Sequence, residues 1–143
     1  MCDFNQQCCV AKIGKAAPDF KGQAVLPSLE FGDIELSQFK GKWLVLFSYP
    51  LDFTFVCPTE IIQFSEQYDQ FKKINCEVVG VSVDSVYSHL AWIGTDRKEG
   101  GIDNIKYPLI GDLGGKISKK YGFYMCDAGH DLRGTVIIDP DGI

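Results

Sequence analysis

The sequence predicts an α/β fold with a central β-sheet. Three apolar runs have the length of buried strands, and the segments between them carry helix patterns. Strands that alternate with helices along a chain are typical of domains in which helices cover a sheet. The chain shows no internal repeat and no linker of biased composition, and its 143 residues are enough for one domain with its own core. We therefore expect residues 1–143 to form a single domain.

The first part of the chain predicts a tail, a short hairpin and a buried strand. Residues 1–12 are expected to be a loose tail. Residues 25–26 (Val-Leu) and 34–36 (Ile-Glu-Leu) flank a turn-forming stretch, which predicts a short hairpin or an irregular connection. Residues 43–47 (Trp-Leu-Val-Leu-Phe) form a continuous apolar run, which indicates a strand that is buried on both faces.

An amphipathic helix is predicted from about residue 58 to residue 73. Its apolar face consists of Ile61, Phe64, Tyr68 and Phe71, which recur at steps of three or four residues. Two lysines end the segment, where the helix dipole favours positive charge. This helix would directly follow residues 48–57, the segment that connects it to the first buried strand.

The middle of the chain predicts a second strand and a second helix. Residues 76–83 read as a buried strand, and Ser85 is a suitable N-cap for a helix that carries Leu90 and Trp92. Residues 97–105 are rich in glycine and charge, which predicts a loop.

The last part of the chain predicts a helix, a strand and an unfinished hairpin. A short helix is expected over residues 113–121 with Gly122 as its stop, and residues 135–138 form the third strand. Residues 139–142 (Asp-Pro-Asp-Gly) are a strong turn signal, yet only Ile143 follows. We expect that the chain is a C-terminally truncated form of a longer protein; the alternative is a domain that ends at this turn.

Composition and charge narrow the classes of function. Hydrophobic residues make up 45% and charged residues 23%, as in ordinary globular proteins, and the net charge of −5 disfavours nucleic acid and anionic membranes as partners. No secretory signal is visible in residues 1–12, and no apolar run approaches the roughly 18 residues that span a bilayer. The six cysteines fit neither a zinc site nor a disulfide framework, so we expect thiols in a reducing, cytoplasmic compartment.

Cys57 lies in a context that favours a reactive thiol. It stands directly before the predicted helix, whose start offers free backbone N–H groups and the positive end of the helix dipole. Pro58 fits the first helical turn, because its ring fixes φ and its missing N–H would be unpaired there. A thiol in such a place ionises more readily than a free cysteine, and the thiolate is the nucleophile. The sequence therefore predicts Cys57 as a nucleophile.

Ionisation of Cys57 requires a cation as well as a helix terminus. Lowering the pKa of a thiol to about 6 gains roughly thirtyfold in thiolate, or about 2 kcal/mol, whereas a helix terminus contributes about 0.3–1 kcal/mol. The chain has two arginines, Arg97 and Arg133, and Arg133 immediately precedes the third predicted strand. Because a guanidinium stays charged and offers several donors in one plane, Arg133 is the candidate partner of Cys57. An ordinary surface arginine is the alternative interpretation.

Four neighbours of Cys57 bear on its chemistry. Thr54 would place a hydroxyl near the sulfur, and Pro50 would shield the site from water; a loop hydroxyl bonded to local backbone is the alternative for Thr54. A carboxylate close to Cys57 would oppose its ionisation, so Asp52 and Glu60 each need a cation or a hydrogen-bonded partner. The alternative for Glu60 is a first-turn acid that the helix dipole favours.

The other thiols and the histidines are assigned simpler roles. The residue three positions after Cys57 is Glu60, so there is no Cys-x-x-Cys pair, and the thiol that resolves an oxidised Cys57 must come from elsewhere in the chain, another subunit or a separate reductant. Cys76 is expected in the core, and Cys126 as an inert thiol in an exposed loop, with a secondary redox thiol as the alternative. Neither histidine has a metal-like set of neighbours, and we expect His89 to pack on its helix or to face solvent.

The segment around Cys57 resembles a known family. Pro50, Thr54 and Cys57 match the Pro-x-x-x-Thr-x-x-Cys motif of peroxiredoxins, and residues 49–60 (Tyr-Pro-Leu-Asp-Phe-Thr-Phe-Val-Cys-Pro-Thr-Glu) resemble the typical two-cysteine subgroup almost word for word. Four further stretches are similar to that subgroup: residues 17–20, 81–85, 89–92 and 133–139.

The resemblance implies a thioredoxin-like fold, with a mixed central sheet flanked by helices, and a thiol peroxidase that reduces hydrogen peroxide and organic hydroperoxides. Cys57 would be the peroxidatic cysteine that becomes sulfenic acid. Thr54 and Arg133 would orient thiolate and peroxide, Pro50 would line the pocket, and Glu60 would hold the arginine. Thioredoxin or a similar dithiol protein would re-reduce Cys57, with no metal, haem or flavin as cofactor.

The resemblance also bears on assembly and on further activities. Homodimers and decamers of five dimers are usual in the subgroup, and a redox-controlled chaperone or a peroxide-signalling relay is the alternative function. The resolving cysteine of the family lies in a Val-Cys-Pro segment beyond residue 143, so this chain would behave as a one-cysteine peroxidase that an external thiol reduces. Residues 100–103 (Gly-Gly-Ile-Asp) replace the Gly-Gly-Leu-Gly of oxidation-sensitive members and are more similar to resistant forms.

Overall fold

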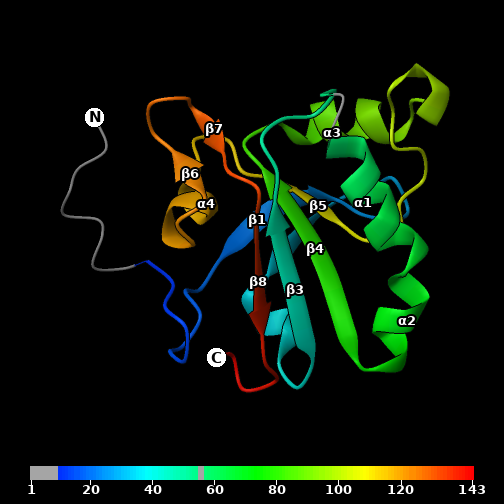
Figure 1. The fold of residues 1–143 in the computed structure, drawn as a ribbon. Coiled ribbons are helices and arrows are strands. Elements are labelled where there is room, and N and C mark those ends of the chain that lie inside the picture. Colours follow the sequence, from blue (N-terminus) through cyan, green and yellow to red (C-terminus); the bar gives the residue numbers. More distant parts are fainter. Residues whose placement is uncertain (1–9, 55–56) are drawn as a thin grey trace.

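The computed structural model describes residues 10–54 and 57–143, and a six-stranded mixed sheet lies at its centre (Figure 1). The strand order is β2-β1-β5-β4-β3-β8. β3 pairs in parallel with β4 and β4 with β5, whereas β1, β2 and β8 join antiparallel. The six strands are β1 (Lys21–Val25), β2 (Phe31–Glu35), β3 (Trp43–Ser48), β4 (Cys76–Ser82), β5 (Leu109–Gly111) and β8 (Gly134–Ile138).

Helices cover both faces of this sheet. One face carries three helices, α1 (Cys57–Glu66), α2 (Tyr68–Lys73) and α3 (Val86–Ile93). The other face carries α4 (Lys116–Lys120) and the small hairpin of β6 (Tyr124–Met125) and β7 (His130–Asp131) (Figure 1). Among the described residues, no helix is long and apolar enough to cross a bilayer.

Each face of the sheet has its own hydrophobic core, because successive side chains of a strand point to opposite faces. In β3, Val45 and Phe47 belong to the core beneath α1, α2 and α3. Leu44 and Leu46 belong to the core on the side of α4. The continuous apolar run of β3 therefore reflects burial on both faces, as the sequence predicts.

The predicted strands are confirmed, and three short ones are additional. The strands β3, β4 and β8 lie where the sequence patterns place them. The predicted hairpin is present, but its strands are displaced: β1 ends at Val25, and β2 already begins at Phe31, inside the stretch that was expected to form the turn. β5, β6 and β7 were not predicted, because they have only three, two and two residues and show no usable periodicity. β5 nevertheless joins the two parts of the sheet, since it pairs with both β1 and β4.

The predicted helices differ from the observed ones in two places. The expected helix over residues 58–73 is interrupted at Gln67, and no glycine or proline marks the break. α4 begins only at Lys116, because Gly114 and Gly115 have positive φ and the Asp112 carboxylate accepts hydrogen bonds from the first-turn N–H groups of Ile117 and Ser118.

The remaining predictions for loops and caps have mixed outcomes. The Ser85 side chain accepts a hydrogen bond from the Ser88 N–H at 3.1 Å and caps α3, as predicted. The loop after α3 contains a short 3₁₀ turn, Arg97–Glu99, and residues 139–142 form the expected turn. The predicted tail lies mostly outside the described residues, but Ala11 donates a backbone hydrogen bond to the Lys120 carbonyl and is therefore bound to the fold.

Candidate active site

Cys57 is the first residue of α1, whereas the sequence placed it directly before a helix that starts at about residue 58. The segment before it links the C-terminal end of β3 to this helix. The position of the Cys57 sulfur, like residues 55–56, lies outside the described part of the structure. The predicted contacts of Thr54, Arg133 and Pro50 with that sulfur therefore stay predictions.

Glu60 and Arg133 form an ion pair beside the start of α1. The Arg133 Nη1 donates to Glu60 Oε2 at 2.9 Å, although the two residues are 73 positions apart in the sequence. Both side chains are partly exposed. Because Glu60 lies one helical turn after Cys57, its carboxylate holds the guanidinium at the end of α1 where Cys57 is located. The expectation that Glu60 requires a cationic partner is confirmed.

Arg133 is placed by the short connection between β7 and β8. Just before it, the Leu132 carbonyl accepts a hydrogen bond from Ser48 Oγ at 2.7 Å, which ties this connection to the end of β3. Just after it, Gly134 packs so tightly that an added Cβ would lie 2.6 Å from the Phe123 ring. The backbone on both sides of Arg133 is therefore fixed.

A surface pocket of about 470 Å³ lies next to this ion pair. Glu60 and Arg133 line its polar side. Phe47, Phe64 and Phe71 line its apolar side, and the rings of Phe47 and Phe64 are stacked with centroids 4.7 Å apart. The guanidinium thus stands at the edge of an aromatic-lined hollow.

Thr54 and Pro50 lie in the segment between β3 and α1, and both are half-buried. The Thr54 hydroxyl donates to the Leu51 carbonyl at 3.1 Å, which is the local backbone bond that the sequence left open as an alternative. Because the hydroxyl donates in this bond, both lone pairs of its oxygen can still accept a hydrogen bond.

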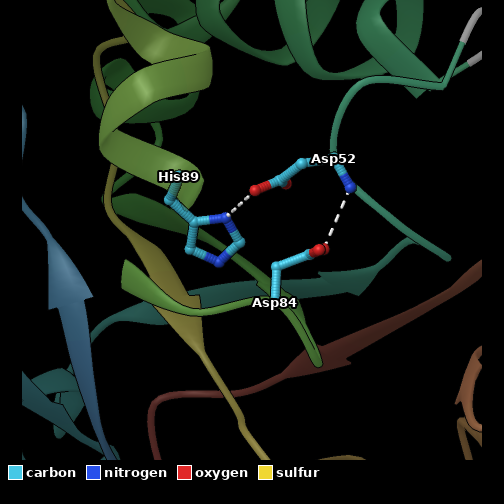
Figure 2. A group of neighbouring side chains, drawn as sticks. All are labelled: Asp52, Asp84 and His89. Atoms are coloured by element: carbon cyan, nitrogen blue, oxygen red, sulfur yellow. Dashed lines mark hydrogen bonds and ion pairs between the residues drawn. The ribbon is translucent and has the colours of Figure 1, made fainter. Parts of the chain in front are cut away.

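Asp52 joins a buried network that the sequence did not predict. Its Oδ2 lies 2.7 Å from His89 Nδ1 and accepts from Ser88 Oγ at 2.9 Å, and its Oδ1 accepts from the Tyr49 hydroxyl at 2.7 Å. Figure 2 shows Asp52, Asp84 and His89 facing one another from the segment after β3, the end of β4 and α3. The expectation that Asp52 requires a partner is confirmed, whereas packing or solvent exposure does not describe His89, which is fully buried in this network.

Burial and charge shift the pKa values of this network. Burial alone disfavours a charged imidazole, but the hydrogen bond and the charge of Asp52 outweigh it, so that the pKa of His89 is raised above its ordinary value. Burial and then the charge of Asp52 raise the pKa of Asp84. Burial, together with Asp52, raises the pKa of Tyr49 well above its ordinary value, which keeps this phenol protonated as a donor.

The same three residues have the chemistry of metal ligands. One ligand atom from each of Asp52, Asp84 and His89 lies within 4.8 Å of the others. However, the 2.7 Å contact between Asp52 and His89 is a hydrogen bond between the two groups themselves, and His89 Nε2 lies 2.9 Å from the Ile110 carbonyl. These atoms are bonded to one another rather than directed at a common centre.

Cys76 and Cys126 have different environments. Cys76 is a free thiol buried in β4, as predicted, and burial raises its pKa. Cys126 is disulfide-bonded, so the expectations of an inert thiol there and of six cysteines that all remain thiols are wrong. Its position in the exposed connection between β6 and β7 leaves the sulfur accessible to a second cysteine, which the sequence spacing did not reveal.

Comparisons with known proteins identify relatives over nearly all of the chain. A model of the "AhpC/TSA family" matches residues 13–143. The chain is 57% identical over 132 residues to "Peroxiredoxin-4" of Dictyostelium discoideum and 56% identical over 133 residues to "Peroxiredoxin-1" of Gallus gallus. These matches cover 92% and 93% of this chain but 51% and 67% of the relatives, so the chain spans about half to two thirds of their length.

Solved structures show the same likeness. A crystal structure of the reduced 2-Cys peroxiredoxin of Plasmodium vivax aligns with a TM-score of 0.90 and 48% identity, and covers 93% of this chain and 82% of that one. A structure of AhpC from Enterococcus faecalis aligns with a TM-score of 0.81 and 36% identity over 90% of this chain and 74% of that one.

Proposed function

This chain belongs to the AhpC/TSA family and has the thioredoxin-like fold that its sequence predicts, and we propose that it is a thiol-dependent peroxidase with Cys57 as the attacking residue. The main support for the proposal is the arrangement of residues at the N-terminus of α1. Cys57 begins α1, and Glu60, one turn later, binds Arg133 at 2.9 Å. A helix N-terminus and a nearby guanidinium both stabilise a thiolate.

In the proposed reaction, the Cys57 thiolate attacks one oxygen of a hydroperoxide. The O–O bond breaks, the sulfur becomes sulfenic acid, and the other oxygen leaves as water or an alcohol after it takes up a proton. Arg133 stabilises the negative charge that develops on the oxygens, and the Thr54 hydroxyl and Pro50 position the hydroperoxide. A dithiol protein such as thioredoxin then reduces the sulfenic acid and releases water.

The proposed substrates of the enzyme are hydrogen peroxide and organic hydroperoxides. The partner protein is thioredoxin or a similar dithiol, and the proposed assembly is a homodimer or a ring of five dimers. These statements rest on the likeness to peroxiredoxins, whose curated members are longer than this chain.

Substitution of Cys57 tests the proposal. We expect Cys57→Ser to abolish peroxide consumption with a dithiol reductant, because a hydroxyl at this position is not a nucleophile of comparable strength. Cys76→Ser is the matched control and should retain nearly full activity, since Cys76 is a buried thiol with a raised pKa. Residual peroxide consumption by Cys57→Ser at the native rate would refute the assignment.

Substitution of Arg133 by lysine tests the same site in a second way. Lysine keeps the charge but loses the planar fork that binds Glu60, so the rate constant for oxidation of Cys57 should fall by about tenfold or more. Stopped-flow measurement with hydrogen peroxide checks this. An unchanged rate would remove Arg133 from the proposed site.

A further inference from the structure

The segment between β3 and α1 contains a strained residue next to a buried anchor. Phe53 has a φ of +59°, a conformation that is unfavourable for a bulky side chain, and about half of its surface is exposed. Its ring contacts Trp92 of α3 at a centroid distance of 6.0 Å. Such a conformation persists only when neighbouring contacts hold it, and the adjacent residue, Asp52, supplies them.

Asp52 is bound through both its backbone and its side chain. Its N–H donates to Asp84 Oδ2 at 2.9 Å, which fixes the segment to the end of β4. Its carboxylate accepts from Tyr49 and Ser88 and contacts His89, which fixes the same segment to α3. Thr54 follows Asp52 by two residues and Cys57 follows it by five. The contacts of Asp52 therefore fix the beginning of the segment that leads to the proposed nucleophile.

The hydrogen bonds of His89 require a proton on each ring nitrogen or a proton shared with Asp52. Nε2 lies 2.9 Å from the Ile110 carbonyl, which can only accept, so Nε2 carries a hydrogen. Nδ1 lies 2.7 Å from Asp52 Oδ2, and this short contact needs a second proton between the two atoms. Both side chains are almost completely inaccessible to water.

Loss of that second proton would leave two acceptors facing each other. If the remaining hydrogen stayed on Nε2, then Nδ1 and the Asp52 carboxylate would oppose each other. If it moved to Nδ1, then Nε2 would oppose the Ile110 carbonyl. Because both side chains are almost completely inaccessible to solvent, either arrangement is costly in place and favours movement of the segment that carries Asp52.

The groups around the pair add negative charge. The segment that starts at the end of β3 contributes Asp52 and the Tyr49 hydroxyl, and the end of β4 contributes Asp84. α3 contributes only the Ser88 hydroxyl besides His89, and β5 contributes the Ile110 carbonyl. Two carboxyl groups near one imidazole favour retention of the proton.

We propose that Asp52 and His89 are a positioning pair whose shared proton holds residues 51–54 against α3 and β4, and whose deprotonation releases the segment that leads to Cys57. The effect on peroxide chemistry rests on the proposed function, whereas the proton-dependent hold of the segment does not. In the held state the segment is ready for reaction, and in the released state Thr54 and Cys57 lose their common placement.

The direction of the pH dependence follows from linkage. The held state keeps its proton above the ordinary His pKa of 6.5, whereas the released state loses it there. The hold is therefore complete below about pH 6.5 and weakens as the pH rises toward the raised pKa of His89, with up to about a tenfold increase in opening for each pH unit.

The test uses the chain with His130→Gln, so that His89 is the one remaining histidine of the two in the sequence. ¹⁵N NMR of the labelled imidazole over a pH series should show that both ring nitrogens keep their hydrogens as the pH passes the ordinary His pKa of 6.5. Amide hydrogen exchange of residues 51–54, corrected for intrinsic base catalysis, should accelerate above pH 6.5. This arm leaves the pair unaltered. A ring that loses one of its hydrogens at or below pH 6.5 would overturn the proposal.

Asp52→Asn in the same background isolates the proton. The amide can donate to a neutral Nδ1 and accept from Tyr49, so the segment stays anchored without a titrating proton. We expect exchange of residues 51–54 that no longer varies with pH above 6.5, and a bare Nδ1 by NMR. The same pH dependence in this variant as in its parent would overturn the proposal.

A third arm separates the pair from the proposed activity. The rate constant of Cys57 with hydrogen peroxide should decline over the same alkaline window in the parent and should lack this decline in Asp52→Asn. A rate constant that declines equally in both proteins would contradict the positioning role. If neither protein consumed peroxide, the proposed function would fail, while NMR and hydrogen exchange would still decide the hold itself.

Discussion

Asp131 is a fully buried carboxyl group with an incomplete set of partners. Its Oδ2 accepts a hydrogen bond from Ser118 Oγ at 2.7 Å, whereas its Oδ1 has no hydrogen-bond partner among the described residues. Burial, with a smaller contribution from the charge of Asp112, raises the pKa of Asp131 to about 6. The folded protein therefore holds a proton on Asp131 at a pH where the unfolded chain does not.

This proton makes the stability of the protein decrease as the pH rises. Because the pKa of Asp131 is raised by folding, its contribution to stability is complete below about pH 4 and is lost as the pH rises to about 6. Asp131→Asn stays neutral throughout. Between pH 4.5 and 7.5, the native chain should lose about 1–3 kcal/mol more of its free energy of unfolding than this variant loses.

Urea denaturation at the two pH values measures this difference. Asp127→Asn is the control, because Asp127 is exposed in the connection between β6 and β7 and should leave the pH dependence unchanged. Equal pH dependence in Asp131→Asn and the native chain would show that Asp131 is ionised in the folded protein.

At the residue scale, the sequence predicted which groups need partners better than it predicted the partners. Glu60 and Asp52 were expected to require compensation, and Arg133 was named for the site before any geometry. His89 was not assigned to Asp52, because 37 positions separate the two residues and a histidine on an amphipathic helix carries no signal of what it faces. The contact arises only when α3 packs against the segment after β3.

At the scale of elements, the turn after α3 shows how tightly backbone can pack against backbone. An added Cβ at Gly101 would lie 1.9 Å from the Thr95 carbonyl oxygen. The neighbouring Gly100 carbonyl accepts a hydrogen bond from Trp92 Nε1 at 2.9 Å, and Ile102 is fully buried. A side chain at position 101 would therefore displace the turn that closes over the indole.

Gly101→Ala should destabilise the protein by about 1–3 kcal/mol through this overlap. Gly94→Ala is a close control, because Gly94 has a φ of −78° and an added Cβ there would lie 3.4 Å from the nearest atom. Thermal or urea unfolding of the two variants compares them. Equal stabilities would mean that the turn can relax without loss of packing.

The prediction of elements was correct where the sequence pattern is long, and it was wrong where pairing with neighbouring strands decides whether a segment is a strand. β3, β4, β8 and α3 have apolar runs or a capped amphipathic pattern that the chain itself displays. β5 has three residues and is a strand only because β1 and β4 lie on either side of it. The interruption of the helix at Gln67 likewise has no local signal and was missed.

At the scale of the whole molecule, the sheet ends in one apolar edge. Among the described residues, β8 pairs only with β3, and Ile137 on this strand is 65% exposed. An exposed edge strand offers unpaired N–H and carbonyl groups to another chain, and an apolar side chain on it favours such contact.

Ile137→Lys should therefore weaken concentration-dependent self-association of this chain, because a charge on an edge strand opposes strand-to-strand contact. Ile13→Lys is the matched control, since Ile13 is fully exposed and lies outside the sheet. Sedimentation velocity over a range of concentrations compares the two. Equal association in both variants and the native chain would show that the β8 edge does not mediate contact.

The fold class followed from the order of patterns, but the two-core arrangement needed the sheet topology. Continuous apolar runs indicated burial on both faces of the central strands, and the structure assigns alternate residues of β3 to separate cores. Which helices cover which face was not deducible from the sequence, because it depends on the crossovers between β3, β4 and β5 (Figure 1).

The two tryptophans give this molecule a built-in optical reporter. Trp92 is fully buried, with the Phe53 and Tyr49 rings at centroid distances of 6.0 and 5.7 Å, whereas Trp43 at the start of β3 is 44% exposed. In a Trp43→Phe background, the emission would come from the single indole that touches Phe53. Changes in the intensity or wavelength of this emission would then report movement of residues 51–54, the segment that leads to Cys57, in real time and without any attached dye.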